Sequence, residues 1–400
     1  MSAQPVERWA VASLVAARVV YAVNWLNIGA LFYLMSSDLN SGVSGLGTLT
    51  SSFYLGVGLM QVPGGVLAAK WGPKNTVTTG MLVSSLAVLA TSVSTSLPEV
   101  VVLRFIVGSG MALVFSPAVV LATRFLGGRS GVGAGLINSA FDVGGLLGLF
   151  GWILIASVTG WRPSLVLSGG LGLLTGLLII ALVPRDQRDN RFTLSTDRLR
   201  RILRNRNLVL LGLAALGSNM GSVLISSFMV FYLQSDLGEV AATAGFVASL
   251  VVILPIITSL WGGRLYDRLK KPRRLLVTSG LGMVAALIAC SVPTLYAASL
   301  GAFVGGIAVG PASTVAFAAA KDLSGVEREY ESLTIGWVNC ISLTGSVSLH
   351  EAYRYRLATP ASLVVGPAVI TLPDLHVTYL RGSSSLEIFP HNVPSFKVKL

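Results

Sequence analysis

The feature that most restricts the fold of this chain is a series of long apolar runs that are almost free of charged residues. Eleven such runs fall between residues 9 and 349. About 20 apolar residues let an α-helix cross a bilayer, and backbone amides that face lipid must be satisfied within their own segment. Each run is therefore predicted to be a transmembrane helix. The predicted spans are residues 9–35, 45–69, 76–96, 100–123, 132–159, 163–183, 208–234, 241–263, 275–292, 295–320 and 332–349.

The amount and the placement of charge exclude a soluble protein and a nucleic-acid binder. Charged residues make up 12% of the chain, whereas ordinary soluble domains contain about 25%. The net charge of +12 would suit a nucleic acid if it were gathered on one surface. Instead, 20 of the 24 lysines and arginines up to residue 347 lie in alternate short connections between the apolar runs. We therefore expect a lipid bilayer as partner and no nucleic acid.

The basic residues also predict how the chain is oriented. The connections after the second, fourth, sixth, eighth and tenth spans hold these 20 charges, whereas the opposite connections hold Arg162 alone. By the positive-inside rule, the N-terminus and the basic connections lie in the cytoplasm. The predicted localisation is a multi-pass cell (plasma) membrane.

Two sequence matches at nearly the same spacing indicate a duplication. Phe-Tyr-Leu at residues 32–34 recurs at 231–233, an offset of 199, and Gly-Gly-x-Leu at 64–67 recurs at 262–265, an offset of 198. Two parallel repeats with a site at their interface are typical of alternating-access transporters. We predict an all-α polytopic membrane protein with two six-helix bundles, in which the last of twelve helices is degenerate or missing. The predicted domains are an N-terminal bundle of six spans at residues 1–183, a basic cytoplasmic linker at 184–207, a C-terminal bundle of five spans at 208–347 and an atypical tail at 348–400.

The tail from Ser348 differs in composition from the rest of the chain. It holds all three histidines but only two of the 44 glycines, and its best apolar stretch, residues 361–372, is too short to span a bilayer. A shifted reading frame or a degenerate terminus would explain the missing twelfth helix, and a soluble tail is the alternative. An apolar helix encoded in another frame beyond Val347 would support the first explanation.

A loop motif follows the second span and recurs in the second half. Residues 65–74 read Gly-Val-Leu-Ala-Ala-Lys-Trp-Gly-Pro-Lys, and residues 263–268 read Gly-Arg-Leu-Tyr-Asp-Arg. Both are similar to the G-x-L-x-D-R-x-G-R-K signature of the major facilitator superfamily, and residues 104–110 resemble its R-x-x-x-G-x-G motif. The resemblance covers residues 9–347 and implies a transporter, which we expect to be a monomer. The gating-loop residues that it implies are Gly65, Lys70, Gly72, Gly263, Asp267 and Arg268.

Within this family the first helices look most like the anion:cation symporter branch. The likeness rests on Arg18, on Ser-Phe-Tyr-Leu at residues 52–55, on Gln-Val-Pro-Gly-Gly at 61–65 and on Gly-Trp-Arg at 160–162. It implies an anionic solute and symport.

Two residues depart from the pattern of the family. Ala69 stands where the family has an aspartate in the first-half loop, so the charge latch that helps to close the cytoplasmic side is absent or is carried by Asp267. Met111 stands where this branch often has a glutamate, which leaves the proton-coupling group open.

Three charged residues lie within predicted spans, where an ionised side chain costs about 2.5–3.5 kcal/mol on insertion scales. The first is Arg18. At 100° per residue, Tyr21 and Trp25 share its helix face and Asn24 lies beside them. A lone cation on such a face attracts an anionic group and holds it by hydrogen bonds. We predict that these four residues bind the solute; the alternative is that Arg18 extends to the membrane surface.

The other two charges, Arg104 and Asp142, are candidates for coupling and charge relay. Arg104 opens the family-like motif in the fourth span, and its alternative role is to hold that helix to neighbouring carbonyls or to Asp142. Asp142 is the only carboxylate within a predicted span. Its protonation would depend on burial and on a nearby arginine, as a coupling site requires. The alternative is a static counter-ion.

The seventh span carries a polar stripe that contains Asn219, Ser222 and Ser226. This span pairs with the first across the cavity of the family that the chain resembles. We therefore predict that Asn219 contributes to solute binding, whereas helix packing is the alternative role of such a stripe.

These observations favour a secondary active transporter that moves a small anionic organic solute by alternating access, with coupling to a proton or cation gradient left open. A non-transporting sensor or inactive remnant is the alternative that Ala69, Met111 and the tail favour. A polytopic membrane enzyme is the less favoured alternative, because it needs clustered histidines or carboxylates and the first 347 residues contain no histidine. We predict that the chain is not an enzyme and uses no cofactor or metal.

Overall fold

The computed structural model describes residues 5–39, 43–184 and 195–343, together with five short strands between Ser362 and Lys399. The chain divides into two compact units, Met1–Ser346 and Val347–Leu400. Among the described residues, regular structure in the first unit is helical and in the second unit consists of strands.

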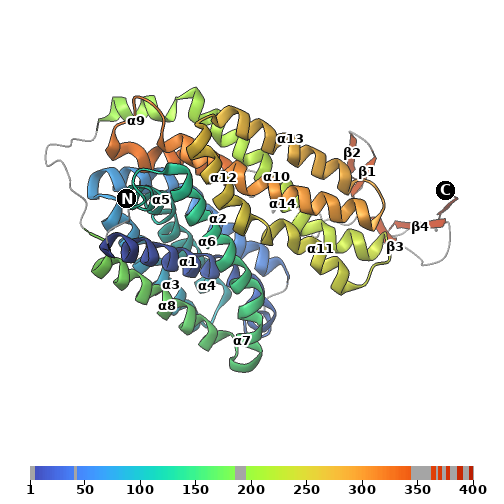
Figure 1. The fold of residues 1–400 in the computed structure, drawn as a ribbon. Helices are drawn as coiled ribbons and strands as arrows, with labels where there is room; N and C mark the ends of the chain where they lie inside the picture. Colours follow the sequence, from blue (N-terminus) through green and yellow to red (C-terminus); the bar gives the residue numbers. More distant parts are fainter. Residues whose placement is uncertain are drawn as a thin grey trace. The chain divides into compact units, whose positions relative to one another are not determined.

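The helices before the arginine-rich connector form the first bundle (Figure 1). These helices follow the apolar runs, and α2 and α7 each end directly before a glycine, Gly72 and Gly160. Gly72, with φ of 87°, makes the turn from which the next helix starts at Pro73, where a missing N–H does no harm. The elements are α1 (Pro5–Asp38), α2 (Val43–Trp71), α3 (Pro73–Ser92), α4 (Leu97–Ala112), α5 (Phe115–Phe125), α6 (Ser130–Leu146), the π-helix η1 (Leu147–Gly151), α7 (Trp152–Thr159) and α8 (Trp161–Leu182).

The second bundle follows a short helix of the connector, α9 (Thr196–Leu203). Its long helices again follow the apolar runs of the sequence. Its elements are α10 (Arg206–Ser235), α11 (Ala241–Ile253), α12 (Pro255–Leu269), α13 (Pro272–Cys290), α14 (Leu295–Lys321), the 3-10 turn η2 (Arg328–Tyr330) and a helix over residues 331–343.

Nine helices within the described residues are long and apolar enough to cross a membrane. The third predicted span forms α3, a helix of 20 residues that is not among the nine. The last predicted span continues beyond residue 343 and so extends past the described residues. The nine are Val6–Asp38, Gly47–Trp71, Leu97–Phe125, Ser130–Thr159, Trp161–Leu182, Arg206–Ser226, Ala242–Leu269, Pro272–Cys290 and Leu295–Lys321.

Three of the predicted spans are interrupted in the structure. A turn at Leu113 and Val114 separates α4 from α5, and a π-helical turn lies between α6 and α7. The helix is interrupted at Leu254, between α11 and α12, because the following Pro255 has no backbone N–H with which to continue the helical hydrogen bonds. Such breaks are where half-helices can reorient within the bilayer.

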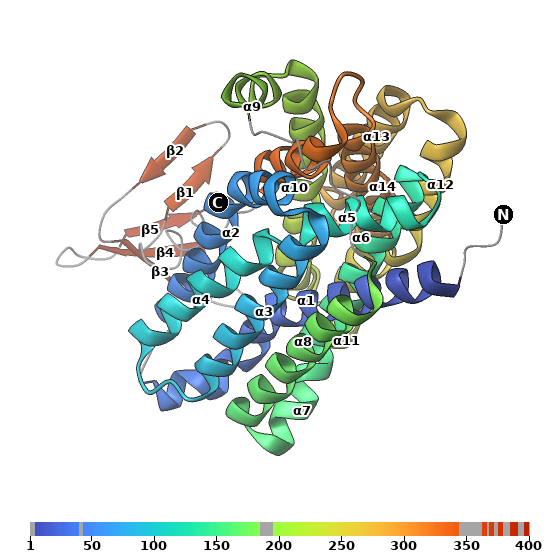
Figure 2. The same ribbon diagram turned by 90° about the vertical axis from the view of Figure 1, so that its left-hand side faces the viewer.

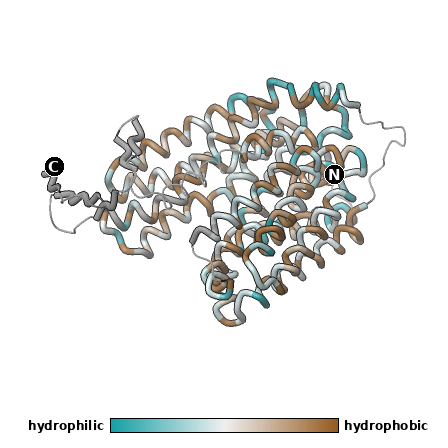
Figure 3. Tube along the Cα trace, turned by 180° about the vertical axis from the view of Figure 1, so that it is seen from behind, coloured by the Kyte–Doolittle hydropathy of each residue, from teal (hydrophilic) through white to brown (hydrophobic). Residues whose placement is uncertain are grey.

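The hydrophobic core shows how the bundles join. The larger cluster of buried residues is built mainly by the first bundle and continues into α14 and the helix over residues 331–343. The rings of Phe115 in α5 and Phe317 in α14 lie 4.8 Å apart across this junction. A smaller cluster lies among α10, α11, α13 and α14. Figure 3 shows hydrophobic residues along the lengths of the helices and hydrophilic ones gathered mainly at their ends.

Helix α6 occupies the boundary between the two bundles. It packs against α1 on one side and against α12 and α14 on the other. Figures 1 and 2 both show it between α1 and α12. Residues on α6 therefore contact both halves of the chain.

The second unit contains two antiparallel sheets. The strands β1 (Ser362–Val365) and β2 (Ala368–Thr371) pair with Leu363 opposite Ile370. The other sheet has the order β3-β4-β5, from β3 (Leu375–Thr378), β4 (Ser385–Pro390) and β5 (Phe396–Lys399). The described part of this unit holds no helix in place of a twelfth span.

Candidate functional site

The guanidinium of Arg18 lies inside the first bundle within a group of aromatic rings. Its Cζ atom is 4.1 Å from the centre of the Tyr21 ring and 4.6 Å from the centres of the Phe115 and Phe141 rings. The residue is 6% exposed, and its Nε and Nη1 atoms have no hydrogen-bond partner among the described residues. Ring faces attract a cation without neutralising it. Arg18 is therefore a buried charge with donors left for an anion.

Trp25 extends this aromatic group, which we call the Arg18 cluster: Arg18, Tyr21, Trp25, Phe53, Tyr54, Phe115 and Phe141. The Trp25 ring lies 5.6 Å from Tyr21 and from Phe141, 4.7 Å from Phe53 and 5.7 Å from Tyr54. Such edge and tilted contacts are the arrangement that aromatic pairs prefer. The predicted partners Arg18, Tyr21 and Trp25 thus lie together, and α2, α5 and α6 complete the group.

Asp142 follows Phe141 in α6 and is half-buried. It makes no hydrogen bond or ion pair within 4 Å with any described residue, but its charge and that of Arg18 are close enough to interact. The structure therefore places the predicted coupling residue beside the predicted anion site, without a static salt bridge.

Arg104 has a different environment from Arg18. Its terminal nitrogens donate to the backbone oxygens of Asn24 at 3.1 Å and of Trp25 at 3.3 Å, and its Cζ lies 4.4 Å from the centre of the Phe53 ring. These bonds attach α4 to α1, which is the packing role that the sequence left open. They also fix the backbone of the Arg18 cluster.

Two asparagines predicted to bind solute are placed in contacts between helices. The side chain of Asn24 donates to the backbone oxygen of Ser168 in α8 at 3.3 Å and accepts from Asn27 at 3.2 Å. In the second bundle, Asn219 in α10 is half-buried and accepts from Ser313 in α14 at 3.2 Å. The binding role of Asn24 and Asn219 stays a prediction.

A second group of functional candidates lies at one end of the first unit. We call this end the basic face, and it is formed by residues 70–74, 124–132, 264–274 and 321–331. There the carboxylate of Asp267, at the end of α12, accepts hydrogen bonds from the backbone N–H groups of Gly131 at 2.9 Å and Val132 at 2.8 Å. These amides begin α6 and would otherwise lack partners, and the positive end of the helix favours a carboxylate. Asp267 therefore joins the second bundle to the first.

Glycines allow the close approach on which this contact depends. Gly131 and Gly263 face each other, and a Cβ atom built on either one would collide with the backbone of the other. Similarly, a Cβ on Gly65 in α2 would lie 2.5 Å from the Cα of Leu333. The helices can therefore meet backbone to backbone only while these positions remain glycine.

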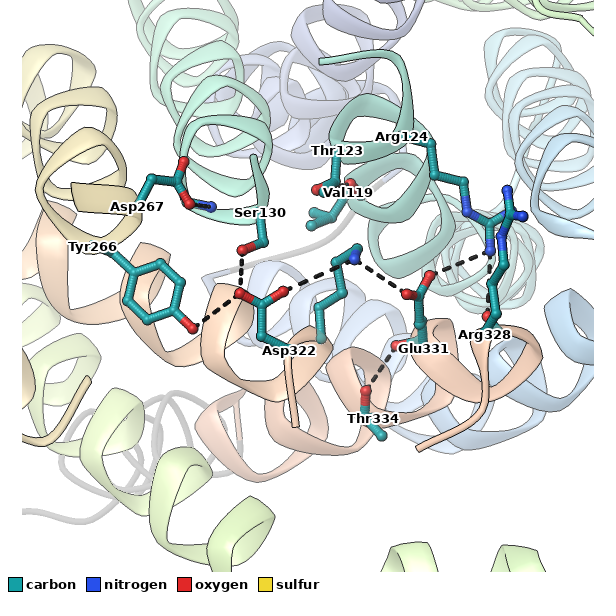
Figure 4. Close-up of polar contacts among 12 residues, drawn as sticks. Val119, Thr123, Arg124, Ser130, Tyr266, Asp267, Asp322, Arg328, Glu331 and Thr334 are labelled. Atoms are coloured by element: carbon teal, nitrogen blue, oxygen red, sulfur yellow. Dashed lines mark hydrogen bonds and ion pairs between the residues drawn. The ribbon is translucent and has the colours of Figure 1, made fainter. Parts of the chain in front are cut away.

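An ionic network continues across the basic face (Figure 4). Asp322 accepts from Ser130 at 2.5 Å, from Tyr266 at 3.2 Å and from Lys270 at 2.9 Å. Although partial burial works against it, the hydrogen bond and charge of Asp322 raise the pKa of Lys270, which keeps this ammonium protonated. The network brings α6, α12 and α14 together.

Glu331 forms the other half of the network. It accepts from Arg124 of α5 at 3.2 Å and from Lys321 of α14 at 3.1 Å. Arg124 also donates to the backbone oxygen of Arg328 at 3.2 Å. Glu331 and Arg124 therefore join α5 of the first bundle to α14 and the following turn of the second bundle.

The remaining predicted gating residues have less specific contacts. Lys70 and Arg268 are exposed, and neither makes an ion pair with a described residue. Gly72 supplies the turn before α3. Among the described residues, no group of three or more His, Cys, Asp or Glu side chains could hold a metal ion.

Several important residues were not predicted from the sequence. The sequence alone does not distinguish Phe115 and Phe141 from the other apolar residues of the spans, and it shows Arg124 and Lys321 only as basic residues of the connections. The signal that could have found the network is the group of four carboxylates in the connection after the tenth span, which are Asp322, Glu327, Glu329 and Glu331.

Comparisons with known proteins agree with these observations. A sequence profile described as "Major Facilitator Superfamily" matches residues 14–348. The chain is 26% identical over 181 residues to the probable sulfoacetate transporter SauU of Cupriavidus necator, and the match covers 45% of this chain and 42% of that protein. It is 27% identical over 340 residues to monocarboxylate transporter 13 of Bos taurus, with 82% and 76% covered.

Solved structures include the crystal structure of a transporter, FucP, in the outward conformation. It matches with a TM-score of 0.66 at 19% sequence identity, over 87% of this chain and 92% of that chain. At this identity the likeness establishes the fold alone. The match to the first relative named above spans less than half of that protein's length, whereas the match to the second spans about three quarters.

Proposed function

The chain belongs to the Major Facilitator Superfamily, and from this premise we propose that it is a secondary transporter that moves a small organic anion by alternating access between two helical bundles. The predicted family and the all-α polytopic fold class are confirmed. This family consists of membrane transporters, so the chain is an integral multi-pass membrane protein and not an enzyme.

The observation that carries the proposed substrate charge is the buried guanidinium of Arg18. An intramembrane cation is costly unless it has a partner or a use, and Arg18 has two donors without partners among the described residues. An anion that binds there satisfies these donors and neutralises the charge in one step. The names of the two relatives, which refer to sulfoacetate and to monocarboxylates, support an anionic solute.

The contacts at the basic face support alternating access. We place this face in the cytoplasm by the positive-inside rule. Asp267, Asp322 and Glu331 then hold the cytoplasmic side closed, and the solute reaches Arg18 from the opposite side. Each charge-assisted hydrogen bond contributes about 1.5–3 kcal/mol. The bonds can therefore bias the closed state and still be broken during each cycle.

Asp142 is the residue through which we propose that transport is coupled to a gradient. It lies next to Phe141 of the Arg18 cluster and has no direct partner among the described residues. Binding of an anion at Arg18 removes the positive charge that favours the ionised carboxylate. Proton uptake at Asp142 then becomes linked to solute binding.

A non-transporting remnant or sensor is the second candidate function, and the substitution of Ala69 for the family's aspartate favours it. Against it, Asp267 retains a complete contact with the start of α6, and Glu331 bridges Arg124 and Lys321. These contacts support a working gate.

Uptake into vesicles separates the two candidates. Purified protein is reconstituted, and accumulation of labelled small carboxylates and sulfonates is followed with and without an imposed proton gradient. Saturable uptake supports a transporter. Binding of an anion without any uptake, by protein that is folded and inserted, supports a sensor.

A further inference from the structure

We propose that the solute is a monoanion with a flat apolar body, such as an aromatic monocarboxylate, and not a dicarboxylate or a sugar acid. This inference rests on the proposed function, because it assumes that Arg18 binds the solute. It is drawn from the charges and rings that surround Arg18.

The charges of the site balance a single anionic group. Within the predicted spans the sequence holds two arginines and no lysine. Both terminal nitrogens of Arg104 already donate to backbone oxygens of α1, which commits this guanidinium to helix packing. Among the described residues, Nε and Nη1 of Arg18 have no hydrogen-bond partner, whereas in Arg104 only Nε has none. A second carboxylate on the solute would have to compete with the bonds that hold Arg104 to α1.

The negative charge of Asp142 also favours a solute with one negative charge over a solute with two. Its carboxylate lies close enough to Arg18 for the two charges to interact. A solute with two negative charges would bring its second charge toward Asp142 or leave it in an apolar environment, and both are unfavourable. A monoanion meets neither penalty.

The surroundings of the guanidinium favour an apolar, flat solute body. Rings of Tyr21, Phe115 and Phe141 surround Arg18 at 4.1–4.6 Å. Trp25, Tyr54 and Phe141 are only half-buried, so they supply the accessible ring surface of the Arg18 cluster. Aromatic rings interact best with other flat π-systems in offset or edge geometries. An aromatic acid can place its carboxylate on Arg18 and its ring against these residues.

The amide nitrogens of the two asparagines beside Trp25 already donate within the first bundle. Asn24 and Asn27, which lie on either side of Trp25 in the sequence, bond to each other and to Ser168 in α8. A sugar acid would bury hydroxyl groups against rings without partners, and each unsatisfied group costs about 1–3 kcal/mol. The site therefore discriminates against hydroxylated acids.

Equilibrium binding to the purified full-length protein tests this selectivity. The probes are benzoate, acetate, succinate and gluconate, and the variants are Arg18→Ala, Phe141→Ala and Phe141→Leu. We expect benzoate to bind at least about 10-fold more tightly than the other three probes, and Arg18→Ala to remove that binding. Phe141→Ala should reduce the preference for benzoate over acetate about 3- to 10-fold, as expected for the loss of one aromatic contact. Phe141→Leu keeps apolar volume and serves if the alanine variant does not fold.

The outcomes distinguish this inference from the proposed function. Arg18-dependent binding of succinate or gluconate at least as tight as that of benzoate overturns the inference and leaves the proposed function standing. An unchanged benzoate preference in both Phe141 variants also overturns it. If no probe shows binding that depends on Arg18, the proposed function and the inference both fail.

Discussion

The carboxylate of Asp267 accepts a hydrogen bond from the backbone N–H of Gly131 at 2.9 Å, and this bond links the last turn of α12 to the first turn of α6. The same carboxylate accepts the amide of Val132 at 2.8 Å. In the first half, the position that corresponds to Asp267 is held by Ala69. The loop motif of the first half therefore has no carboxylate at the position where the second half contacts α6.

Asp267→Ala is expected to open the basic face. The change leaves two amide donors of α6 without an acceptor and removes a negative charge from a helix N-terminus. A loss of about 1–3 kcal/mol raises the population open at this face about 5- to 150-fold. The rate of alkylation of Ser259→Cys measures this opening, because Ser259 is 2% exposed in the structure. The native Cys290 and Cys340 are first replaced by serine so that only the new thiol reacts.

Arg264→Ala is the matched control for this measurement. Arg264 is exposed on the same helix and makes no hydrogen bond or ion pair with a described residue. Its variant should show the wild-type alkylation rate. Equal rates in Asp267→Ala and the wild type would show that this carboxylate does not hold the bundles together.

Gly263→Ala is expected to slow transport at least about 10-fold by preventing the close approach of α12 and α6. A Cβ at this position would lie 2.6 Å from the carbonyl carbon of Gly131, which is far inside van der Waals contact. Gly280→Ala in α13 is the control, because a Cβ there meets nothing within 4 Å. Both changes favour a helix by a similar amount. Initial uptake rates of the two variants are compared after normalisation to the amount of inserted protein. Equal rates in Gly263→Ala and Gly280→Ala would contradict the role of the contact between α12 and α6.

Arg104→Lys is expected to reduce stability more than Arg18→Lys. Lysine at position 104 cannot donate to both Asn24 and Trp25 in the geometry of the guanidinium. The loss of a charge-assisted bond, about 1.5–3 kcal/mol, should lower the melting temperature by about 3–10 °C. Arg18 has no such bond through Nε and Nη1, so Arg18→Lys should remain within about 2 °C of the wild type. The same melting temperature for both variants would rule out the packing role of Arg104.

Asp142→Asn is expected to separate transport from the proton gradient. The amide of asparagine neither binds nor releases a proton, so the variant should exchange anions between the two sides but should not accumulate them. Uptake against a concentration gradient, measured at several imposed pH differences, checks this. Accumulation that still follows the pH difference would place the coupling group elsewhere.

Much of the architecture could be predicted because lipid leaves few alternatives. Runs of about 20 apolar residues must be helices, and the alternation of charge divides the connections into two classes. The spacing within one helix is also fixed, so Arg18, Tyr21 and Trp25 could be placed together from the sequence. Asp267 was recognised because its motif is repeated.

Contacts between helices could not be predicted in the same way. The rotation of each helix about its axis depends on packing with neighbours, and spacing in one sequence does not contain that information. For this reason the sequence did not show that Arg104 donates to α1 or that Phe115 and Phe141 surround Arg18. The bond between Asn24 and Ser168 was missed for the same reason.

The central claim is that Arg18 is the anion-binding charge of a transporter, and uptake by three reconstituted proteins tests it most directly. The wild type, Arg18→Lys and Arg18→Ala are compared for saturable uptake of labelled carboxylates and sulfonates at matched levels of inserted protein. Removing one partner of a buried charge pair costs about 2–5 kcal/mol, so Arg18→Ala should lose about 30-fold or more of its anion affinity. We predict saturable uptake by the wild type, partial uptake by Arg18→Lys and none by Arg18→Ala. Undiminished uptake by Arg18→Ala would contradict the account.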